Sequence, residues 1–424
     1  MLIESRDALR GEITVPGDKS ISHRAIVAGT LASGTTEIDN FLLNEDCIST
    51  IECFRKMQVG IEILQDNKVR VQGKGLYGLR SPTLPLNAGR SGTAVRLLLG
   101  VLCGQPFNST IIRDESAMKK PVGKSVNLLK QMGANISGKE DGALCPLLLS
   151  PAKIKGGSFD LSILDTNIKS PLLLAGLYAE NETVVREAIK SRDHTELMLN
   201  YFGANIKTDG LEVKSHAVEN LYAQHVSIPG DISMAAYFIT AALLVKKSDI
   251  LIRNVGINPT RTGILNVYKS MGAKIELLNE RLESNEKVAD IHVLSTPLTC
   301  TKIDKSLIPS LIDELPVITV AAAFAKGTTE ITGLAGFKIK ESGKMKALAF
   351  ELLKMGAKIS ENEDGFVIEG RESLRGTIVE SNNNHSLAMA LSVAGLVAEG
   401  ETMIRKSQAV DIVYPTFFQT LNKL

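Results

Sequence analysis

The feature that most constrains the fold of this chain is a short motif that recurs along its length. A helix-type segment ends in Met-Gly-Ala-x-Ile or a close variant at residues 57–61, 132–136, 202–206, 271–275 and 355–359. Glycine just past a helix supplies the left-handed residue that ends it, and the β-branched residue that follows begins a strand. Each copy therefore predicts a helix, a turn and a strand in that order.

A second motif alternates with the first, in which an apolar helix rich in small residues leads through a polar break into a β-type run. It stands at residues 32–38, 325–331 and 398–404, with weaker copies at 106–111, 180–185 and 247–252. The period of ~70 residues is longer than that of solenoid repeats. The sequence thus predicts an α/β protein built from six diverged copies of one βαβαββ unit.

Two places break the repeat in the same way and indicate domain boundaries. Pro-Gly-Asp stands before a helix-type segment at residues 16–18 and again at 229–231. We interpret both as crossings between domains of three repeats each, residues 1–17 with 230–424 and residues 18–229. Paired crossings make a hinge, and hinged halves commonly close on a ligand, so we expect a cleft between the domains. Two surface turns that look alike by chance are the alternative.

Composition excludes several classes of function. The 48 Lys and Arg residues nearly cancel the 47 Asp and Glu residues, so the net charge of +1 gives no long-range field for nucleic acid or membrane. Trp is absent and aromatic residues are 4%, which argues against base stacking. The five cysteines show no zinc-ligand spacing, and neither a signal core nor a bilayer-long apolar stretch occurs. We expect a cytoplasmic protein without a metal.

The first candidate for anion binding is the helix that follows the first crossing. Lys19 and Ser20 open this helix, and Arg24 lies one turn on, on the same face as Ser20. A helix N-terminus with free N–H groups, an ammonium and a hydroxyl is a ready anion site. A capped, solvated helix end is the alternative.

The second candidate is a glycine loop at residues 86–96. Its glycines let backbone N–H groups approach a phosphate, and Arg90 and Arg96 can both reach an anion there. The loop lacks the Gly-Lys-Ser/Thr end of a nucleotide P-loop. Further along, Asp313 and Glu314 precede an apolar helix, where they suit either a general base or a helix cap.

Together these motifs resemble the enolpyruvyl transferase family, over essentially the whole chain and in the same order. The matching segments are residues 16–24, 88–96, 191–196, 229–233, 313–314 and 340–342. The resemblance implies two inside-out, barrel-like α/β domains. It also implies transfer of the enolpyruvyl group of phosphoenolpyruvate to the 5-hydroxyl of shikimate 3-phosphate, with release of phosphate. No metal or organic cofactor is implied, the partners are these small molecules, and we expect a monomer.

The resemblance also implies roles for individual residues. Lys19, Asp313 and Glu341 would form the acid–base set. The implied substrate-binding set is Ser20 and Arg24 at the shikimate carboxylate, Ser191 and Lys340 at its phosphate, and Gly92 and Thr93 at phosphoenolpyruvate. We extend the binding set to Arg90, Arg96, Lys120, Thr166, Asn167, Lys344 and His385.

Several positions depart from the family pattern. Arg90 replaces Asn, Lys120 and Lys344 replace Arg, Asp165-Thr166-Asn167 replaces Ser-Ala/Ser-Gln, Ser386 replaces Arg and Ile412 replaces Lys. Arg-to-Lys changes keep the charge but lose the two-pronged hydrogen bond. Losing a charged partner of a buried anion costs about 2–5 kcal/mol, so Ser386 and Ile412 weaken the expected phosphoenolpyruvate site. Asp165 places a carboxylate where a substrate phosphate should bind.

Three functions therefore stay open on the sequence. The first is the family's reaction, with Arg90, Lys120 and Lys344 in place of the usual ligands. The second is that of a specialised-pathway paralogue, acting on a shikimate-like or other cyclic acceptor in the same cleft, with or without phosphoenolpyruvate. The third is non-catalytic binding, against which the intact acid–base set counts. A UDP-sugar enolpyruvyl transferase is disfavoured because the loop at residues 105–123 has no Cys. We take the first as our prediction because it is the most specific.

Overall fold

The computed structural model describes residues 1–165, 167–335 and 339–424, with the backbone alone for 339–342. The chain divides into two compact units. Unit 1 comprises Met1–Pro16, Pro229–Leu282 and Lys287–Leu424, and unit 2 comprises Gly17–Ile228 and Glu283–Glu286. The expected crossings lie one residue from these limits, whereas the sequence assigned residues 283–286 to the other domain.

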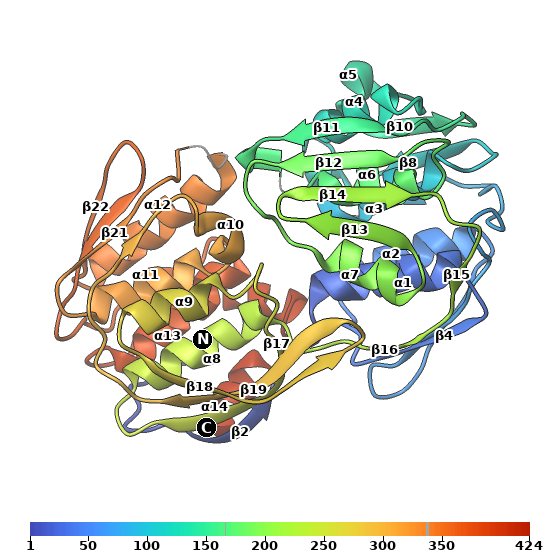
Figure 1. The fold of residues 1–424 in the computed structure, drawn as a ribbon. Helices are drawn as coiled ribbons and strands as arrows, with labels where there is room; N and C mark the ends of the chain where they lie inside the picture. The colour runs from blue at the N-terminus through green and yellow to red at the C-terminus, as the bar shows by residue number, and fades with distance from the viewer. Residues whose placement is uncertain (166, 336–338) are drawn as a thin grey trace. The chain divides into compact units, whose positions relative to one another are not determined.

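Unit 2 contains three four-stranded sheets within its described residues. Their strand orders are β16-β4-β6-β5, β7-β8-β10-β9 and β11-β12-β14-β13 (Figure 1). The strands are β4 (Thr35–Asp39), β5 (Gly60–Ile63), β6 (Val69–Gln72), β7 (Leu86–Asn87), β8 (Ser109–Ile112), β9 (Asn135–Gly138), β10 (Leu144–Ser150), β11 (Gly157–Leu161), β12 (Thr183–Glu187), β13 (Asn205–Asp209), β14 (Glu212–His216) and β16 (His225–Ser227). In each sheet the first pair is parallel and the other two pairs are antiparallel, so one topology is repeated.

The helices of unit 2 fall into two sets. The inner set, α1 (Lys19–Leu31), α3 (Gly92–Leu102) and α6 (Lys169–Gly176), is buried along nearly its whole length. The outer set comprises α2 (Glu45–Lys56), α4 (Gly123–Gln131) and α7 (His194–Tyr201), and a short α5 (Lys139–Gly142) follows β9. Helices that are apolar all round belong in a core, which is why helices rather than sheets fill the centre of the unit. A short strand pair, β3 (Ala32–Ser33) with β15 (Leu221–Tyr222), completes it.

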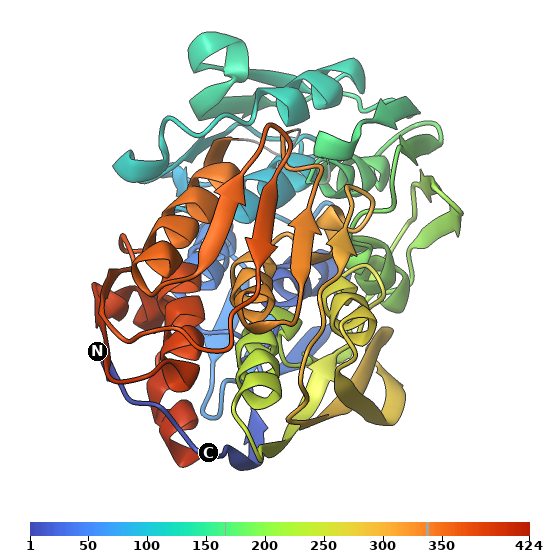
Figure 2. The same cartoon turned by 90° about the vertical axis from the view of Figure 1, so that its left-hand side faces the viewer.

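Unit 1 repeats the three-sheet plan, but in its described residues one of the sheets has three strands rather than four. Its described sheets have the orders β18-β19-β17-β2, β20-β21-β23-β22 and β1-β25-β24, and Figure 2 shows the orange strands of the second sheet side by side. The strands are β1 (Leu2–Ile3), β2 (Arg10–Thr14), β17 (Asp249–Gly256), β18 (Lys274–Glu283), β19 (Glu286–Leu294), β20 (Lys302–Ile303), β21 (Thr328–Ile331), β22 (Lys358–Glu361), β23 (Phe366–Glu369), β24 (Ile378–Glu380) and β25 (Thr402–Arg405). The N-terminal β1 and β2 thus complete two sheets whose other strands come from the second half of the chain.

The helices of unit 1 follow the same division. The buried helices α8 (Ile232–Leu244), α11 (Leu315–Phe324) and α13 (His385–Val397) pack on one another. The remaining helices are α9 (Gly263–Ser270), α10 (Ile308–Leu311), α12 (Ile339–Lys354) and α14 (Phe417–Lys423). Within the described ranges, none of the helices combines the length and hydrophobicity that a bilayer crossing requires.

The repeat motif has the backbone conformation that the sequence predicts. Gly133, Gly203, Gly272 and Gly356 have φ values between 85° and 97°, in the left-handed region that ends a helix. The strands β9, β13, β18 and β22 each begin two residues later. The prediction of a helix, a turn and a strand is confirmed at these four positions. It is also confirmed at the looser copy at residues 57–61, where Gln58 has φ of 64° between α2 and β5.

Candidate functional site

A polar pocket in unit 2 brings together part of the predicted site. Five predicted residues line it, Ser20, Arg24, Thr93, Arg96 and Asn167, together with Leu97, Ser170 and Arg192. These side chains come from α1, α3, the start of α6 and the residue Asn167 just before it, and the segment before α7. The described lining therefore carries three arginines and no carboxylate, which suits an anionic ligand.

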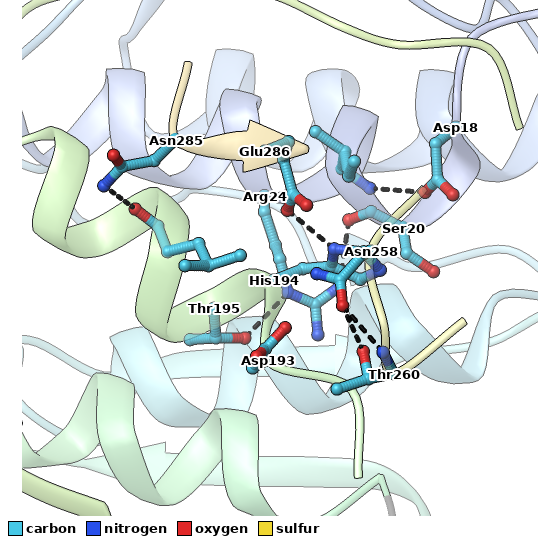
Figure 3. A network of polar contacts seen from close by, with 12 residues as sticks. Asp18, Ser20, Arg24, Asp193, His194, Thr195, Asn258, Thr260, Asn285 and Glu286 are labelled. Atoms are coloured by element: carbon cyan, nitrogen blue, oxygen red, sulfur yellow. Dashed lines mark hydrogen bonds and ion pairs between the residues drawn. The ribbon is translucent and has the colours of Figure 1, made fainter. Parts of the chain in front are cut away.

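Arg24 is held rigidly at this pocket. Asp18 caps α1 by accepting a hydrogen bond from the Ile21 N–H at 2.9 Å, and Arg24 follows one turn later. Its Nε donates to Thr195 Oγ1 at 2.7 Å and its Nη1 to the Ser20 carbonyl at 2.9 Å (Figure 3). Its Nη2 donates to Ser170 Oγ at 2.8 Å. Burial lowers the pKa of Arg24 to about 10, partly opposed by Glu196, so the guanidinium is charged at neutral pH.

Lys19 is directed to a partner that the sequence did not indicate. Its ammonium pairs with the carboxylate of Asp46 on α2. Burial alone would raise the pKa of Asp46, but the nearby Lys19 charge and hydrogen bond outweigh it and lower that pKa. The pair thus fixes an ammonium at the start of α1. Nothing in the spacing of the two residues could have predicted it.

His23 links α1 to α2 and to the glycine loop. Its buried ring lies 2.8 Å from Thr50 Oγ1 through Nδ1 and 3.4 Å from Ser91 Oγ through Nε2. Burial, aided by the Lys19 charge, lowers the pKa of His23 to about 3, so the ring is neutral at physiological pH. Ser91 in turn caps α3 by accepting a hydrogen bond from the Ala94 N–H at 3.1 Å.

The glycine loop separates the two arginines that the sequence placed on one anion. Gly89 has φ of 57° and turns the chain, so that Gly92 opens α3. Arg96 Nη1 donates to the Gly92 carbonyl at 3.1 Å and lines the polar pocket. Arg90 instead lines a separate groove with Asp46, Ser49 and Asp114. Among the described pocket residues Arg90 does not join Arg96.

Asp165 is satisfied within the protein. It is 4% exposed, accepts hydrogen bonds from the Ser162 N–H at 2.9 Å and from Ser162 Oγ at 2.6 Å, and pairs with Lys124. Burial raises the pKa of Asp165, but these partners outweigh it and lower that pKa. The carboxylate is thus partnered by unit 2 itself. Thr166 lies outside the described residues.

Ser191 lies in the polar layer beneath the pocket. Its buried hydroxyl donates to Glu187, which pairs at 2.9 Å with the buried Lys169, and Lys169 also lies 2.7 Å from Glu196. The described pocket lining contains its neighbour Arg192 rather than Ser191. Arg192 and Ser170 were not predicted as site residues, although Arg192 stands in the matching segment at residues 191–196.

The site residues of unit 1 are placed by a second buried network. Asp313 is exposed on the turn before α11, and its neighbour Glu314, 1% exposed, accepts a hydrogen bond from Ser233 Oγ. The buried Arg261 donates to the same hydroxyl at 2.7 Å and to Asp231 Oδ1 at 3.2 Å. The network ties the turn that carries Asp313 to the start of α8.

The remaining predictions fall on α12, α13 and the C-terminal segment. Lys340 and Glu341 lie on α12, but their side chains are outside the described residues, and Lys344 is half-buried. His385 opens α13 after the cap Asn384, while Ser386 is buried near Tyr237, and Ile412 is 45% exposed. In the described ranges, no group of three or more His, Cys, Asp or Glu side chains could hold a metal.

Comparisons with known proteins agree with this architecture. Residues 3–421 match the family described as EPSP synthase (3-phosphoshikimate 1-carboxyvinyltransferase). Relatives named 3-phosphoshikimate 1-carboxyvinyltransferase are 49% identical in Thermoanaerobacter sp. (strain X514) and 44% identical in Brevibacillus brevis, each with 100% of this chain and 99% of the relative covered. EPSP synthase from Acinetobacter baumannii is similar in structure, with a TM-score of 0.92, 38% identity, and 100% of this chain and 97% of that chain covered.

The fold and these relatives define the class: the chain is an enolpyruvyl transferase. Within that class, it belongs to the EPSP synthase family.

Proposed function

We propose that this chain transfers the enolpyruvyl group of phosphoenolpyruvate to the 5-hydroxyl of shikimate 3-phosphate and releases phosphate. The observation that carries the proposal is the polar pocket of unit 2, in which three arginines converge and Arg24 is fixed by three hydrogen bonds. The full-length family match supports the same reaction.

The pocket fits the acceptor, which carries a carboxylate and a phosphate. Ser20 and Arg24 hold the carboxylate, because a guanidinium with three of its donors already engaged presents the others in a fixed direction. Arg192, Ser170 and Asn167 supply further polar groups on the same lining. The Lys169 network beneath them holds the segment that carries Arg192. Ser191, Thr166 and Lys340 stay predictions as phosphate ligands.

The acid–base roles are those that the resemblance implies. The attacking hydroxyl loses its proton as its oxygen bonds to C2 of phosphoenolpyruvate, and C3 gains a proton. The tetrahedral intermediate then breaks its bond to the phosphate oxygen while C3 returns a proton, which leaves the enol ether. Lys19 brings an ammonium and Asp313 an exposed carboxylate to this exchange, with Glu341 as the third member.

For phosphoenolpyruvate we propose Gly92, Thr93 and Arg96 on α3, with Lys120, Lys344 and His385 as further anion ligands. Arg90 stays a prediction from the sequence, because its side chain lines a separate groove. Ser386 and Ile412 bring no charge, and this observation favours the second candidate, a paralogue that uses the same acceptor pocket without phosphoenolpyruvate. The two candidates differ in the donor and share the acceptor site.

Phosphate release with purified protein, shikimate 3-phosphate and phosphoenolpyruvate separates them, with Asp313→Ala as the control. Turnover by the wild type that is lost in the control supports the proposed reaction. Absence of turnover, with shikimate 3-phosphate still raising the melting temperature, contradicts it and favours the paralogue.

We further propose that the chain acts as a cytoplasmic monomer and that its domains are those expected from the sequence, residues 1–17 with 230–424 and residues 18–229. The net charge of +1, which gives no long-range field for nucleic acid or membrane, supports the cytoplasmic location. Sedimentation equilibrium tests whether the chain is a monomer.

A further inference from the structure

Arg113 is a buried arginine that the reaction proposed above does not use. It follows β8 directly and is 6% exposed. Its Nη2 donates to the Arg90 carbonyl at 3.1 Å and its Nη1 to the Lys120 carbonyl at 3.3 Å. Because the guanidinium is planar and its donors form a rigid fork, these two bonds set the distance between the two carbonyls.

The two carbonyls belong to different loops of unit 2. One is the loop at residues 89–92, which leads into α3, and the other is the segment at residues 119–122, which leads into α4. Each has its own local bonds, from Asp114 N–H to the Gly89 carbonyl at 3.1 Å and from Val122 N–H to the Ala143 carbonyl at 2.9 Å. The Arg113 side chain connects one loop to the other.

Arg113 also borders the start of α3. A Cβ added to Gly92 would lie 3.0 Å from Arg96 Nη1 and 4.0 Å from Arg113 Nη2. The Arg113 Nε is buried and has no hydrogen-bond partner among the described residues. Burying an arginine in this way costs folding free energy, so packing alone is a poor reason for its presence.

We propose that Arg113 is a positioning residue that ties the loop at residues 89–92 to the segment at 119–122 and thereby sets the affinity for phosphoenolpyruvate. The inference rests on the proposed function, which assigns Gly92 and Lys120 to that substrate. Affinity for shikimate 3-phosphate is independent of the tie, because Arg24 is held by Thr195, Ser170 and the Ser20 carbonyl.

Steady-state kinetics of two variants test whether Arg113 connects the two loops in this way, a connection called the tie below. Arg113→Met keeps the length of the side chain without donors, and Arg113→Lys keeps the charge but not the fork. Arg186→Met is the matched control, because Arg186 is half-exposed on β12 and bonds to Glu212 and Ser158. Both Arg113 variants should raise KM for phosphoenolpyruvate about ten- to hundredfold, from lost charged hydrogen bonds, and leave KM for shikimate 3-phosphate within about twofold.

Three kinetic results would overturn the proposal. They are a normal KM for phosphoenolpyruvate in Arg113→Met, an equal rise in both KM values, and full rescue by Arg113→Lys, which would mean that charge alone is needed. The Arg186→Met control should match the wild type in both KM values, and a control that loses phosphoenolpyruvate affinity to the same degree would also count against the tie.

Amide hydrogen exchange of the ligand-free protein gives a readout that does not depend on the reaction. In Arg113→Met, exchange should become faster at residues 89–92 and 118–122 and stay unchanged at 191–196. Unchanged exchange in both loops would refute the tie. If the wild type releases no phosphate, the proposed function fails and the exchange result still decides the tie. If Arg113→Met does not fold, Arg113→Lys carries both measurements.

Discussion

At the scale of single residues, the acceptor binding that we propose for the polar pocket depends on how Arg24 is oriented. Its three hydrogen bonds reach α1 itself, α6 and α7. A lysine at this position keeps a positive charge but offers one point of attachment rather than a planar fork. If Arg24 binds the acceptor carboxylate as proposed, we expect its orientation, more than its charge, to set the affinity.

Arg24→Lys should raise KM for shikimate 3-phosphate about tenfold or more, since charged hydrogen bonds contribute about 1.5–3 kcal/mol each. KM for phosphoenolpyruvate should change little. Steady-state kinetics at saturating co-substrate measure both constants, with Arg186→Lys as the control. An unchanged KM for shikimate 3-phosphate would remove Arg24 from the acceptor site.

His23 makes stability depend on pH in a defined direction. Burial lowers its pKa to about 3 in the folded protein, whereas an unfolded histidine titrates near pH 6.5. Between these values the unfolded chain binds a proton that the folded protein does not, so stability falls as the pH falls below about 6.5. The slope reaches up to ~1.4 kcal/mol per pH unit.

Urea unfolding of wild type and His23→Gln measures this contribution. The measurements are made at about pH 7, 6 and 5, which bracket the unfolded-state pKa of His23. The variant should be less stable at pH 7, because it loses the geometry of the contacts with Thr50 and Ser91. Its stability should also fall less steeply on acidification. Equal slopes in the two proteins would show that His23 does not stay neutral on folding.

At the scale of elements, the close approach of α3 and α6 depends on glycine. A Cβ added at Gly100 would lie 2.7 Å from the Pro171 carbonyl oxygen and 2.8 Å from Leu174 Cβ. Separations under 3 Å require the helices to move, and backbone atoms cannot turn aside as a flexible side chain can. This close packing explains why small residues occur in these helices.

Gly100→Ala should destabilise the protein by about 1–3 kcal/mol, the usual cost of overpacking, despite the higher helix propensity of Ala. Gly343→Ala on α12 is the matched control, because nothing lies within 4 Å of its added Cβ, and we expect no loss of stability there. Thermal and urea unfolding measure both changes. A Gly100→Ala protein as stable as the control would mean that the helices separate without cost.

The sequence predicted the ends of helices and the starts of strands better than any other feature. The helix-ending glycines and the strands after them follow from local backbone preferences, which neighbouring residues reveal. The Asp18, Ser91 and Asn384 caps are equally local. The order of the strands in each sheet cannot be predicted from such local preferences. Pairings such as β16 with β4 join residues about two hundred positions apart in sequence.

At the scale of the whole molecule, the two units differ in how the chain builds them. Unit 2 is nearly continuous in sequence, apart from residues 283–286. Glu286 in this distant segment contacts the buried His194, with Oε1 2.7 Å from Nδ1 (Figure 3). Unit 1 takes β1 and β2 from the N-terminus, and without them β25 and β17 each lose a paired strand. The fragments of the chain should therefore differ in foldability.

A fragment of residues 17–228 should fold on its own with lower stability than the intact chain, because His194 loses its partner. A fragment of residues 229–424 should fold only when a peptide of residues 1–16 is added. Circular dichroism and urea unfolding of the separate fragments measure this. Cooperative folding of 229–424 alone would contradict the importance of β1 and β2.

The sequence by itself determined the repeat, the α/β class, the family and the two helix starts at Lys19 and Gly92 that we propose as anion-binding sites. These features depend on residues close together in the chain, where glycine, capping and hydrophobic spacing act locally. Most of the predicted pocket residues also came from motifs of this kind.

Only the tertiary structure decided which charged groups meet. It placed Arg192 rather than Arg90 in the polar pocket, paired Lys19 with Asp46, and turned Asp165 towards Lys124. Each of these outcomes depends on how helices far apart in sequence pack. Side-chain charges interact strongly over a few ångströms where water is excluded, so packing geometry, which no local pattern encodes, selects the partners.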